Sequence, residues 1–172
     1  PTVNGKIELK YLQSAIRNLA SGYLKTKNNY CVIVARSTLP PGTTEEVIIP
    51  VLEAHSGKKA GKDFGVCINP EFLREKAAED DFKNPWLITI GSIDKQSGET
   101  IEDLYGAVDC PIVHISLKEA EMQKYIHNLW NACKISFFNE MRAVCEGLGG
   151  TDADKIFKLT TQSAEGFWNP EY

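Results

Sequence analysis

The sequence predicts an α/β fold in which a parallel sheet flanked by helices is followed by an all-α segment built on one long helix. Short apolar runs alternate with segments of helical periodicity over residues 1–115, which is the pattern of a parallel sheet with helices on both faces. A single helical pattern then runs unbroken from about residue 117 to the glycines at 149 and 150. We therefore expect two domains, at residues 1–115 and 116–172.

The first elements are a helix, a buried strand and a second helix. Apolar residues recur at helical spacing over residues 8–27, and residues 30–35 are continuously apolar, as in a strand buried on both faces. Pro40-Pro41 excludes a helix from the following loop. Thr43 and Glu46 have the spacing of a capping box, which predicts a helix from Thr43 to about residue 55.

The same alternation continues to residue 115 and then stops. Further strands are expected at residues 64–68, 86–90 and 111–115, with a helix over residues 95–107. Ser116 and Glu119 form a second capping box. The helix that they begin has about 32 residues and a length of roughly 48 Å, which is long for a crossover helix. A short helix over residues 152–160 follows.

Composition excludes two classes of partner. Lys and Arg number 19 against 23 Asp and Glu, and the net charge of −4 comes with no basic patch, so we expect no nucleic-acid partner. No run of about 18 apolar residues is present, so we expect no membrane span. The opening residues 1–5 are polar and predict no signal peptide.

The cysteines and histidines show no spacing typical of a metal site or a disulfide framework. The five cysteines stand at positions 31, 67, 110, 133 and 145, and the three histidines are scattered. We expect buried free thiols, and hence a reducing compartment, the cytoplasm. No metal site is expected.

Two polar loops follow the first two predicted strands, where ligands of an open parallel sheet bind. They are residues 37–42 and residues 69–75. If the second loop begins a helix, Glu71 and Glu75 share one face, and paired carboxylates suit proton transfer. The alternative is that both glutamates only favour a helix N-terminus through its dipole. The residues leave these two interpretations open.

The long helix carries a polar stripe. Five side chains fall within about 80° of one another at 100° per residue. They are Lys124, Asn128, Asn131, Asn139 and Arg142. Asparagine is a poor helix former, which favours a ligand-binding stripe over a merely solvated face. The opposite side is apolar and includes Trp130, Phe137 and Met141.

Taken in order and spacing, these stretches resemble the UDP-glucose/GDP-mannose 6-dehydrogenase family over essentially the whole chain. The matching stretches are Ser37-Thr38-x-Pro-x-Gly42, Asn69-Pro70-Glu71-Phe72-Leu73-Arg74-Glu75, Ala120-Glu121-Met122-x-Lys124-Tyr125-x-x-Asn128 and Phe138-Asn139-Glu140. The second of these is the most distinctive. Residues 56–65 and 94–96 are most similar to the GDP-mannose branch. The chain then corresponds to an internal fragment that joins the end of a Rossmann-like NAD-binding domain to a central helical domain.

The resemblance implies an activity and roles for individual residues. Such enzymes oxidise C6 of a nucleotide sugar to the carboxylate with two NAD per turnover, through a cysteine thioester. By position, Glu71, Lys124 and Asn128 resemble catalytic residues, and Thr38 and Glu75 resemble cofactor-binding residues. The implied substrate-binding residues are Glu75, Lys124, Asn128, Asn131 and Asn139. Asn131 stands where GDP-mannose enzymes have a histidine, which leaves the choice of sugar open. The helix at 117–149 resembles the one that forms the homodimer in this family.

Departures from the family pattern limit what the chain is expected to do by itself. The Gly-rich phosphate loop would precede residue 1, and the segment with the nucleophilic cysteine would follow residue 172. We therefore expect weak or no NAD binding and no activity of this fragment alone. Two alternatives remain, a β-hydroxyacid dehydrogenase relative and a non-catalytic dimerisation or nucleotide-sugar-binding module.

Overall fold

The computed structural model describes residues 2–3 and 6–163, and the chain forms two compact units, Pro1–His127 and Asn128–Tyr172. The first turns of the long helix α5 (Leu117–Leu148) belong to the first unit, because Leu117 and Ala120 are buried in its core. The boundary between the two compact units therefore falls within α5, between His127 and Asn128, and not at residue 116. The assignment of 1–115 and 116–172 as domains stays a prediction.

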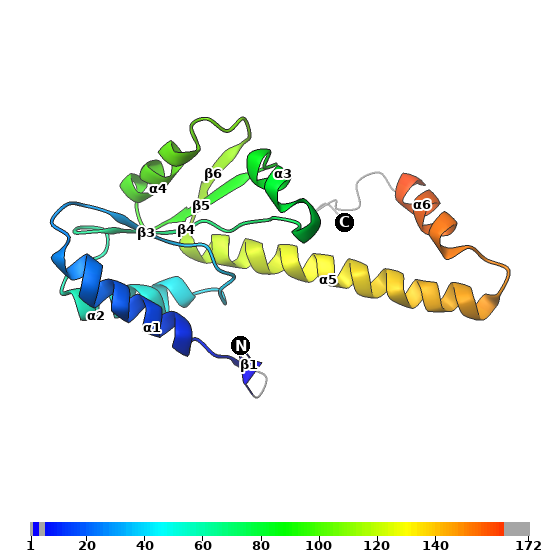
Figure 1. The fold of residues 1–172 in the computed structure, drawn as a ribbon, viewed down its shortest axis with the longest axis horizontal. Helices are drawn as coiled ribbons and strands as arrows, with labels where there is room; N and C mark the ends of the chain where they lie inside the picture. Colours follow the sequence, from blue (N-terminus) through cyan, green and yellow to red (C-terminus); the bar gives the residue numbers. More distant parts are fainter. Residues whose placement is uncertain (1, 4–5, 164–172) are drawn as a thin grey trace. The chain divides into compact units, whose positions relative to one another are not determined.

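The first unit is built on a four-stranded sheet whose spatial order follows the sequence (Figure 1). Its strands are β3 (Val32–Ala35), β4 (Gly65–Ile68), β5 (Ile88–Ser92) and β6 (Ile112–Ile115). The β3–β4 and β5–β6 pairs are parallel, but β4 and β5 are antiparallel, with Cys67 opposite Ser92. The expectation of a fully parallel sheet is therefore wrong at this one pair.

The connection between β4 and β5 explains the reversal. It contains only a 3₁₀ turn, Glu75–Ala77, and the short helix α3 (Ala78–Lys83). A parallel neighbour needs a crossover that carries the chain back to the edge where the previous strand began. Because this segment stays at the carboxyl edge of β4, the next strand starts there and runs in the opposite direction.

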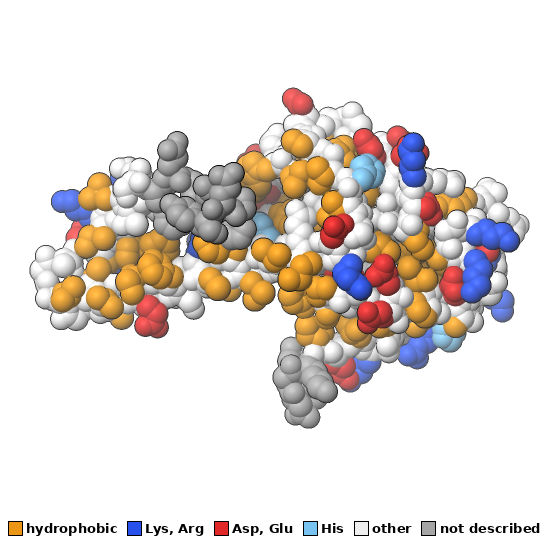
Figure 2. Space-filling model, turned by 180° about the vertical axis from the view of Figure 1, so that it is seen from behind, with side chains coloured by type: hydrophobic (Ala, Val, Ile, Leu, Met, Phe, Trp, Pro, Cys, Tyr) orange, Lys and Arg blue, Asp and Glu red, His pale blue; other side chains and the backbone are white. Residues whose placement is uncertain are grey.

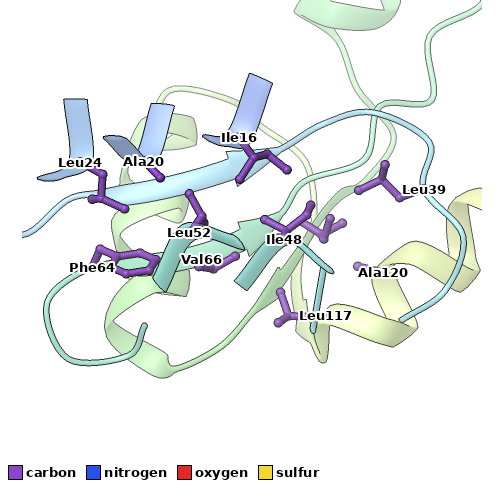
Figure 3. Close-up of a cluster of buried hydrophobic side chains, with 11 residues drawn as sticks. Ile16, Ala20, Leu24, Leu39, Ile48, Leu52, Phe64, Val66, Leu117 and Ala120 are labelled. Carbon is purple, nitrogen blue, oxygen red and sulfur yellow. The ribbon is translucent and has the colours of Figure 1, made fainter. Parts of the chain in front are cut away.

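Helices cover both faces of the sheet, as the sequence predicts (Figure 1). One face packs against α1 (Lys10–Asn18), its π-helical continuation Leu19–Leu24, the π-helical turn Thr44–Ile48 with α2 (Ile49–Ser56), and the start of α5. Figure 3 shows the core on this side, where Phe64 and Val66 lie beside Leu52. The other face packs against α4 (Lys95–Glu102) and the 3₁₀ turn Asp103–Tyr105.

The capping box predicted at the start of α5 is confirmed. The backbone N–H of Ser116 donates to Glu119 Oε2 at 2.8 Å, and the N–H of Glu119 donates to Ser116 Oγ at 3.3 Å. The hydrogen bonds from Ser116 lower the pKa of Glu119. Gly149 and Gly150 have φ of +65° and +67°, a backbone conformation that ends a helix readily only at glycine.

The second unit consists of the remainder of α5 and the helix α6 (Ala153–Ser163). Arg142 donates to Asp154 Oδ1 at 2.5 Å and lies over the ring of Phe157. Phe138 packs edge-on against Phe157 at 4.9 Å between ring centroids. These contacts fold α6 against α5.

Near the N-terminus, β1 (Thr2–Val3) pairs with β2 (Lys6–Ile7), a small ladder that the sequence did not predict.

Burial of the cysteines differs from the expectation. All five are free, but only Cys67 is buried, Cys133 is exposed, and the other three are half-buried. Burial raises the pKa of the Cys67 thiol to about 12. Cys31 and Cys110 lie just before β3 and β6, and Cys133 and Cys145 lie on α5, where the fold leaves their side chains exposed or only half covered. Among the described residues, no helix combines the length and apolar character needed to cross a bilayer.

Candidate functional site

A cavity of about 220 Å³ opens in the first unit where the loop after β4 meets α5. Its walls are largely aromatic and apolar, with a few polar side chains among them. The polar lining residues include Arg36, Asn69 and Glu71, and the aromatic ones include Phe72, Trp86 and Tyr105. An apolar cavity with a few converging polar groups is the usual form of a small-molecule site.

Lys124 and Glu71 form an ion pair beside this cavity. Lys124 Nζ lies 3.0 Å from Glu71 Oε1 and also donates to the backbone carbonyl oxygen of Glu71. The Lys124 side chain is only 7% exposed, whereas that of Glu71 is 35% exposed. Lys124 Nζ also lies 5.4 Å from the centre of the Phe72 ring. The ammonium group is therefore held in one place by contacts from a single loop.

The carboxylate of Glu71 is stabilised in its charged form. Burial raises its pKa, but the N–H of Leu73 and the ammonium of Lys124 act in the opposite direction, with a smaller contribution from Arg36. The net result is a pKa below the usual range of a glutamate. Glu71 is thus ionised at neutral pH and able to accept a proton or orient a water molecule.

A second polar network holds the ends of β3 and β4 together. Arg36 Nη1 donates to Asn69 Oδ1 at 3.0 Å and contacts the Tyr105 hydroxyl at 2.9 Å, and that hydroxyl also donates to Asn69 Oδ1. The Asn69 side-chain amide donates to the carbonyl of Thr89 at 2.9 Å. The buried Asn69 therefore sets where the loop that carries Glu71 leaves the sheet.

The loop at residues 69–75 does not begin a helix, so the condition under which Glu71 and Glu75 would share one helical face is not met. Arg74 is extended, the 3₁₀ turn starts only at Glu75, and Glu75 is exposed away from the cavity walls. Glu71 and Glu75 therefore do not share a helical face. The reason is a contact with α3 seven residues later, because Arg74 binds Asp81 with both side-chain and backbone N–H groups and lies over the Trp86 ring. These contacts hold the backbone at Arg74 in an extended conformation instead of a helical one.

The loop at residues 37–42 is held by a residue to which the sequence analysis gave no role. Glu121 on α5 is 2% exposed and accepts hydrogen bonds from the backbone N–H groups of Gly42 and Thr44 and from the Thr44 hydroxyl. The predicted capping box of Thr43 and Glu46 is wrong, since neither side chain caps this helix end. The only signal for Glu121 in the sequence was that it belongs to the stretch 120–128 that matches the family pattern.

The structure brings only some of the expected site residues together. Lys124 and Glu71 meet, while Thr38 and Glu75 are exposed outside the cavity walls. Asn128 and Asn139 are exposed and Asn131 is half-buried, all on the part of α5 that belongs to the second unit. The described residues contain no group of three metal-ligating side chains.

Comparison with known proteins places both parts of the chain in one family. The family models "UDP-glucose/GDP-mannose dehydrogenase family, NAD binding domain" and "central domain" match residues 1–109 and 118–171. The chain is 47% identical over 160 residues to a GDP-mannose 6-dehydrogenase of Pseudomonas syringae pv. tomato, covering 92% of this chain and 36% of that protein. It is 34% identical over 170 residues to the UDP-glucose 6-dehydrogenase AglM of Haloferax volcanii, covering 96% of this chain and 39% of that protein.

Solved structures agree with these sequence matches. A ternary complex of GDP-mannose dehydrogenase from Pseudomonas aeruginosa superposes with a TM-score of 0.90 at 37% identity, over 98% of this chain and 39% of that one. A UDP-glucose dehydrogenase from Pyrobaculum islandicum superposes with a TM-score of 0.85 at 37% identity, over 93% of this chain and 36% of that one. The chain thus spans somewhat more than a third of the length of these relatives.

Proposed function

Because the chain belongs to the UDP-glucose/GDP-mannose dehydrogenase family, we propose that it forms part of the active site of an NAD-dependent nucleotide-sugar 6-dehydrogenase. The substrate that we propose is GDP-mannose, oxidised at C6 to the carboxylate. Support for the sugar comes from identity, which is 47% to a GDP-mannose enzyme and 34% to a UDP-glucose enzyme. The observation that carries the proposal is the Lys124–Glu71 pair beside the apolar cavity.

The pair suits the two halves of such a reaction. Oxidation of an alcohol to a carboxylate places negative charge on the oxygen at the reacting carbon, and a buried, fixed ammonium stabilises that charge. Lys124 supplies this group, since Glu71 and the Phe72 ring hold it in place. Glu71, ionised at neutral pH, accepts the proton of the water that hydrolyses the acyl intermediate. NAD, when bound, accepts the hydride in each of the two oxidation steps.

The other proposed roles rest on position in the family pattern. Asn128 stands one helical turn after Lys124 and is proposed to bind the reacting oxygen with it. Asn131, Asn139 and Glu75 are proposed to bind the substrate, and Thr38 and Glu75 to bind the cofactor. The proposed compartment is the cytoplasm.

The residues of this chain fit NAD only in part. A dinucleotide site needs a Gly-rich turn between a strand and a helix, and the 172-residue sequence contains no G-x-G-x-x-G stretch. Thr38 and Glu75, the proposed cofactor contacts, are both exposed. We therefore expect the isolated chain to bind NAD weakly or not at all and to oxidise no nucleotide sugar.

Isothermal titration of the chain with GDP-mannose, UDP-glucose and NAD, each separately, tests the proposal. We expect measurable heat with GDP-mannose, less with UDP-glucose and little with NAD, since the Lys124–Glu71 pair proposed to act at the reacting carbon lies beside the cavity, whereas a dinucleotide needs a Gly-rich turn that this sequence does not contain. Tighter binding of UDP-glucose would show that the proposed sugar is wrong. If neither sugar nucleotide binds, the chain is better described as a non-catalytic dimerisation module.

We also propose that the chain forms a homodimer through α5. Several large apolar side chains of the second unit are exposed, among them Leu129, Phe137, Val144 and Leu148. They share one side of the helix at 100° per residue. Figure 2 shows hydrophobic side chains gathered over this unit, at the left of the view. A continuous apolar surface of this kind usually marks an interface.

Light scattering at tens of micromolar tests the dimer. The wild-type chain should have twice its 19.1 kDa mass. Phe137→Glu should yield monomers, because it places a charge within the apolar face, where Phe137 is 55% exposed. Ala132→Glu adds the same charge at an exposed position about 140° from Phe137 around the helix and should leave the mass unchanged. A monomeric wild-type chain would refute the proposal.

A further inference from the structure

Glu121 is a buried carboxylate with an unusual set of partners. It is 2% exposed, and its two oxygens accept from the backbone N–H of Gly42, from the N–H of Thr44 at 2.8 Å and from the Thr44 hydroxyl at 2.6 Å. Thr44 begins a helical segment, whose first N–H groups have no partner within the helix and carry partial positive charge. Glu121 therefore satisfies donors that the loop itself leaves open.

The same helical turn of α5 also carries the proposed catalytic lysine. Lys124 follows Glu121 by three residues, so both side chains leave α5 on the same side. Lys124 binds the loop after β4 through Glu71, and Glu121 binds the loop after β3 through Gly42 and Thr44. One turn of α5 thus binds both the loop that follows β3 and the loop that follows β4, two neighbouring parallel strands.

The loop after β3 has few other means of keeping its place. Pro40 and Pro41 have no N–H to donate, and Gly42 adopts φ of +93°. Within the loop, Thr43 binds the carbonyl of Pro40, which shapes the turn but does not attach it to α5. Leu39 is buried in the same core cluster as Leu117 and Ala120 of α5 (Figure 3). An apolar contact of this kind is non-directional. The ion pair of Lys118 on α5 with Glu45 is exposed, at 57% and 47% of the side chains, so it adds little, and the register of the loop on α5 depends mainly on the buried Glu121.

We propose that Glu121 is a positioning residue that fixes the loop at 37–44 relative to the Lys124–Glu71 pair. Its buried carboxylate holds the loop through directional bonds, and the loop carries Thr38, the proposed cofactor contact. Only this last link rests on the proposed function. The coupling between the loop and α5 rests on the hydrogen bonds alone.

Amide hydrogen exchange of the 172-residue chain, followed by mass spectrometry, tests the coupling. Glu121→Gln keeps the shape but loses the charge and one acceptor, so we expect exchange over residues 37–46 to be at least about tenfold faster. Peptides covering β4 and residues 69–75 should exchange as in the wild-type chain. The matched control is Glu119→Gln, which removes an exposed capping carboxylate two residues earlier on the same helix and should leave residues 37–46 unchanged.

Two substitutions of Thr44 separate a positioning role from a general loss of stability. Thr44→Val removes the hydroxyl bond to Glu121 at constant volume and should accelerate exchange in the same peptide. Thr44→Ser keeps the hydroxyl and should restore protection. Acceleration spread evenly over the sheet, or a loop that responds equally to Glu119→Gln and Glu121→Gln, would overturn the proposal.

Ligand binding provides the link to the proposed function. If GDP-mannose binds, Glu121→Gln and Thr44→Val should weaken its binding at least threefold, because the bonds that they remove also anchor the turn of α5 that carries Lys124. Glu119→Gln and Thr44→Ser should not weaken it. Unchanged affinity in all four variants would show that the loop position does not matter to the site. If the wild-type chain binds no nucleotide sugar, the proposed function fails while the exchange result still decides whether Glu121 positions the loop.

Discussion

A Lys124→Met variant should lose about 2 kcal/mol of unfolding free energy at pH 7 and much less under acidic conditions. Removing one partner of a buried ion pair leaves the other charge uncompensated, at about 3–5 kcal/mol when both are fully buried. The smaller figure allows for water, because the Glu71 side chain is 35% exposed. Methionine keeps the length and apolar stem of the lysine, so the change acts mainly through charge.

The pH dependence follows from the pKa of Glu71. In the wild-type chain this pKa lies below its usual value, partly because of Lys124. A carboxyl group with a lowered folded-state pKa contributes stability above its unfolded-state pKa and loses it as the pH falls through the folded value. Without Lys124 the folded pKa rises, so the stability difference between variant and wild type is largest at neutral pH and shrinks on acidification.

Urea unfolding at pH 7 and pH 3.5, with a ¹³C titration of the Glu71 carboxyl, checks this expectation. Lys118→Met is the matched control, because Lys118 lies on the same helix but is 57% exposed and pairs with the exposed Glu45. Its loss should cost less than about 1 kcal/mol at either pH. An equal loss for Lys124→Met at both pH values would contradict the assigned ion pair. GDP-mannose binding, where measurable, should fall at least about tenfold in Lys124→Met only.

A Gly91→Val variant should lose about 3 kcal/mol or more of unfolding free energy, because Gly91 permits α5 to pack directly on β5. A Cβ at this position would lie 2.6 Å from the Cβ of Ala120, 2.9 Å from the carbonyl oxygen of Ser116 and 3.2 Å from the Cα of Leu117. Two of these are backbone atoms, so no side-chain rotation relieves the overlap. The start of α5 must move, at the cost typical of severe overpacking.

Chemical unfolding of Gly91→Val and Gly91→Ala, with Gly22→Ala as control, checks the close approach. No atom lies within 4 Å of a Cβ built at Gly22, and alanine there should raise stability by up to about 1 kcal/mol. A shift of the start of α5 also moves the next turn, where Glu121 binds the loop after β3 and Lys124 binds the loop after β4. Amide exchange should therefore accelerate in Gly91→Ala over residues 37–46 and over residues 69–75. Wild-type stability of Gly91→Val would mean that α5 does not approach β5 this closely.

Local patterns in the sequence were sufficient for most elements of the fold. The Ser116–Glu119 capping box and the helical period that follows it predict the start and length of α5, and continuous apolar runs locate the four strands. These signals are recognisable because each arises from residues within four positions or from a repeat of fixed period. Lys124 and Glu71 were picked out in the same way, by residue type and by the stretches that contain them, although their proposed roles stay predictions.

What the sequence by itself determined is therefore the α/β class, the order of helices and strands, the family and the residues that line up with its motifs. Only the tertiary structure decided that β4 and β5 run antiparallel, that Arg74 and Asp81 keep Glu75 off the face expected for Glu71, and that Glu121 rather than Glu46 caps the segment at Thr44. The physical reason is the sequence separation of the groups involved. Glu121 lies 77 residues from Thr44 and Lys124 lies 53 residues from Glu71, and no local period encodes which distant donor reaches a given acceptor. Such pairings exist only once packing brings the elements together.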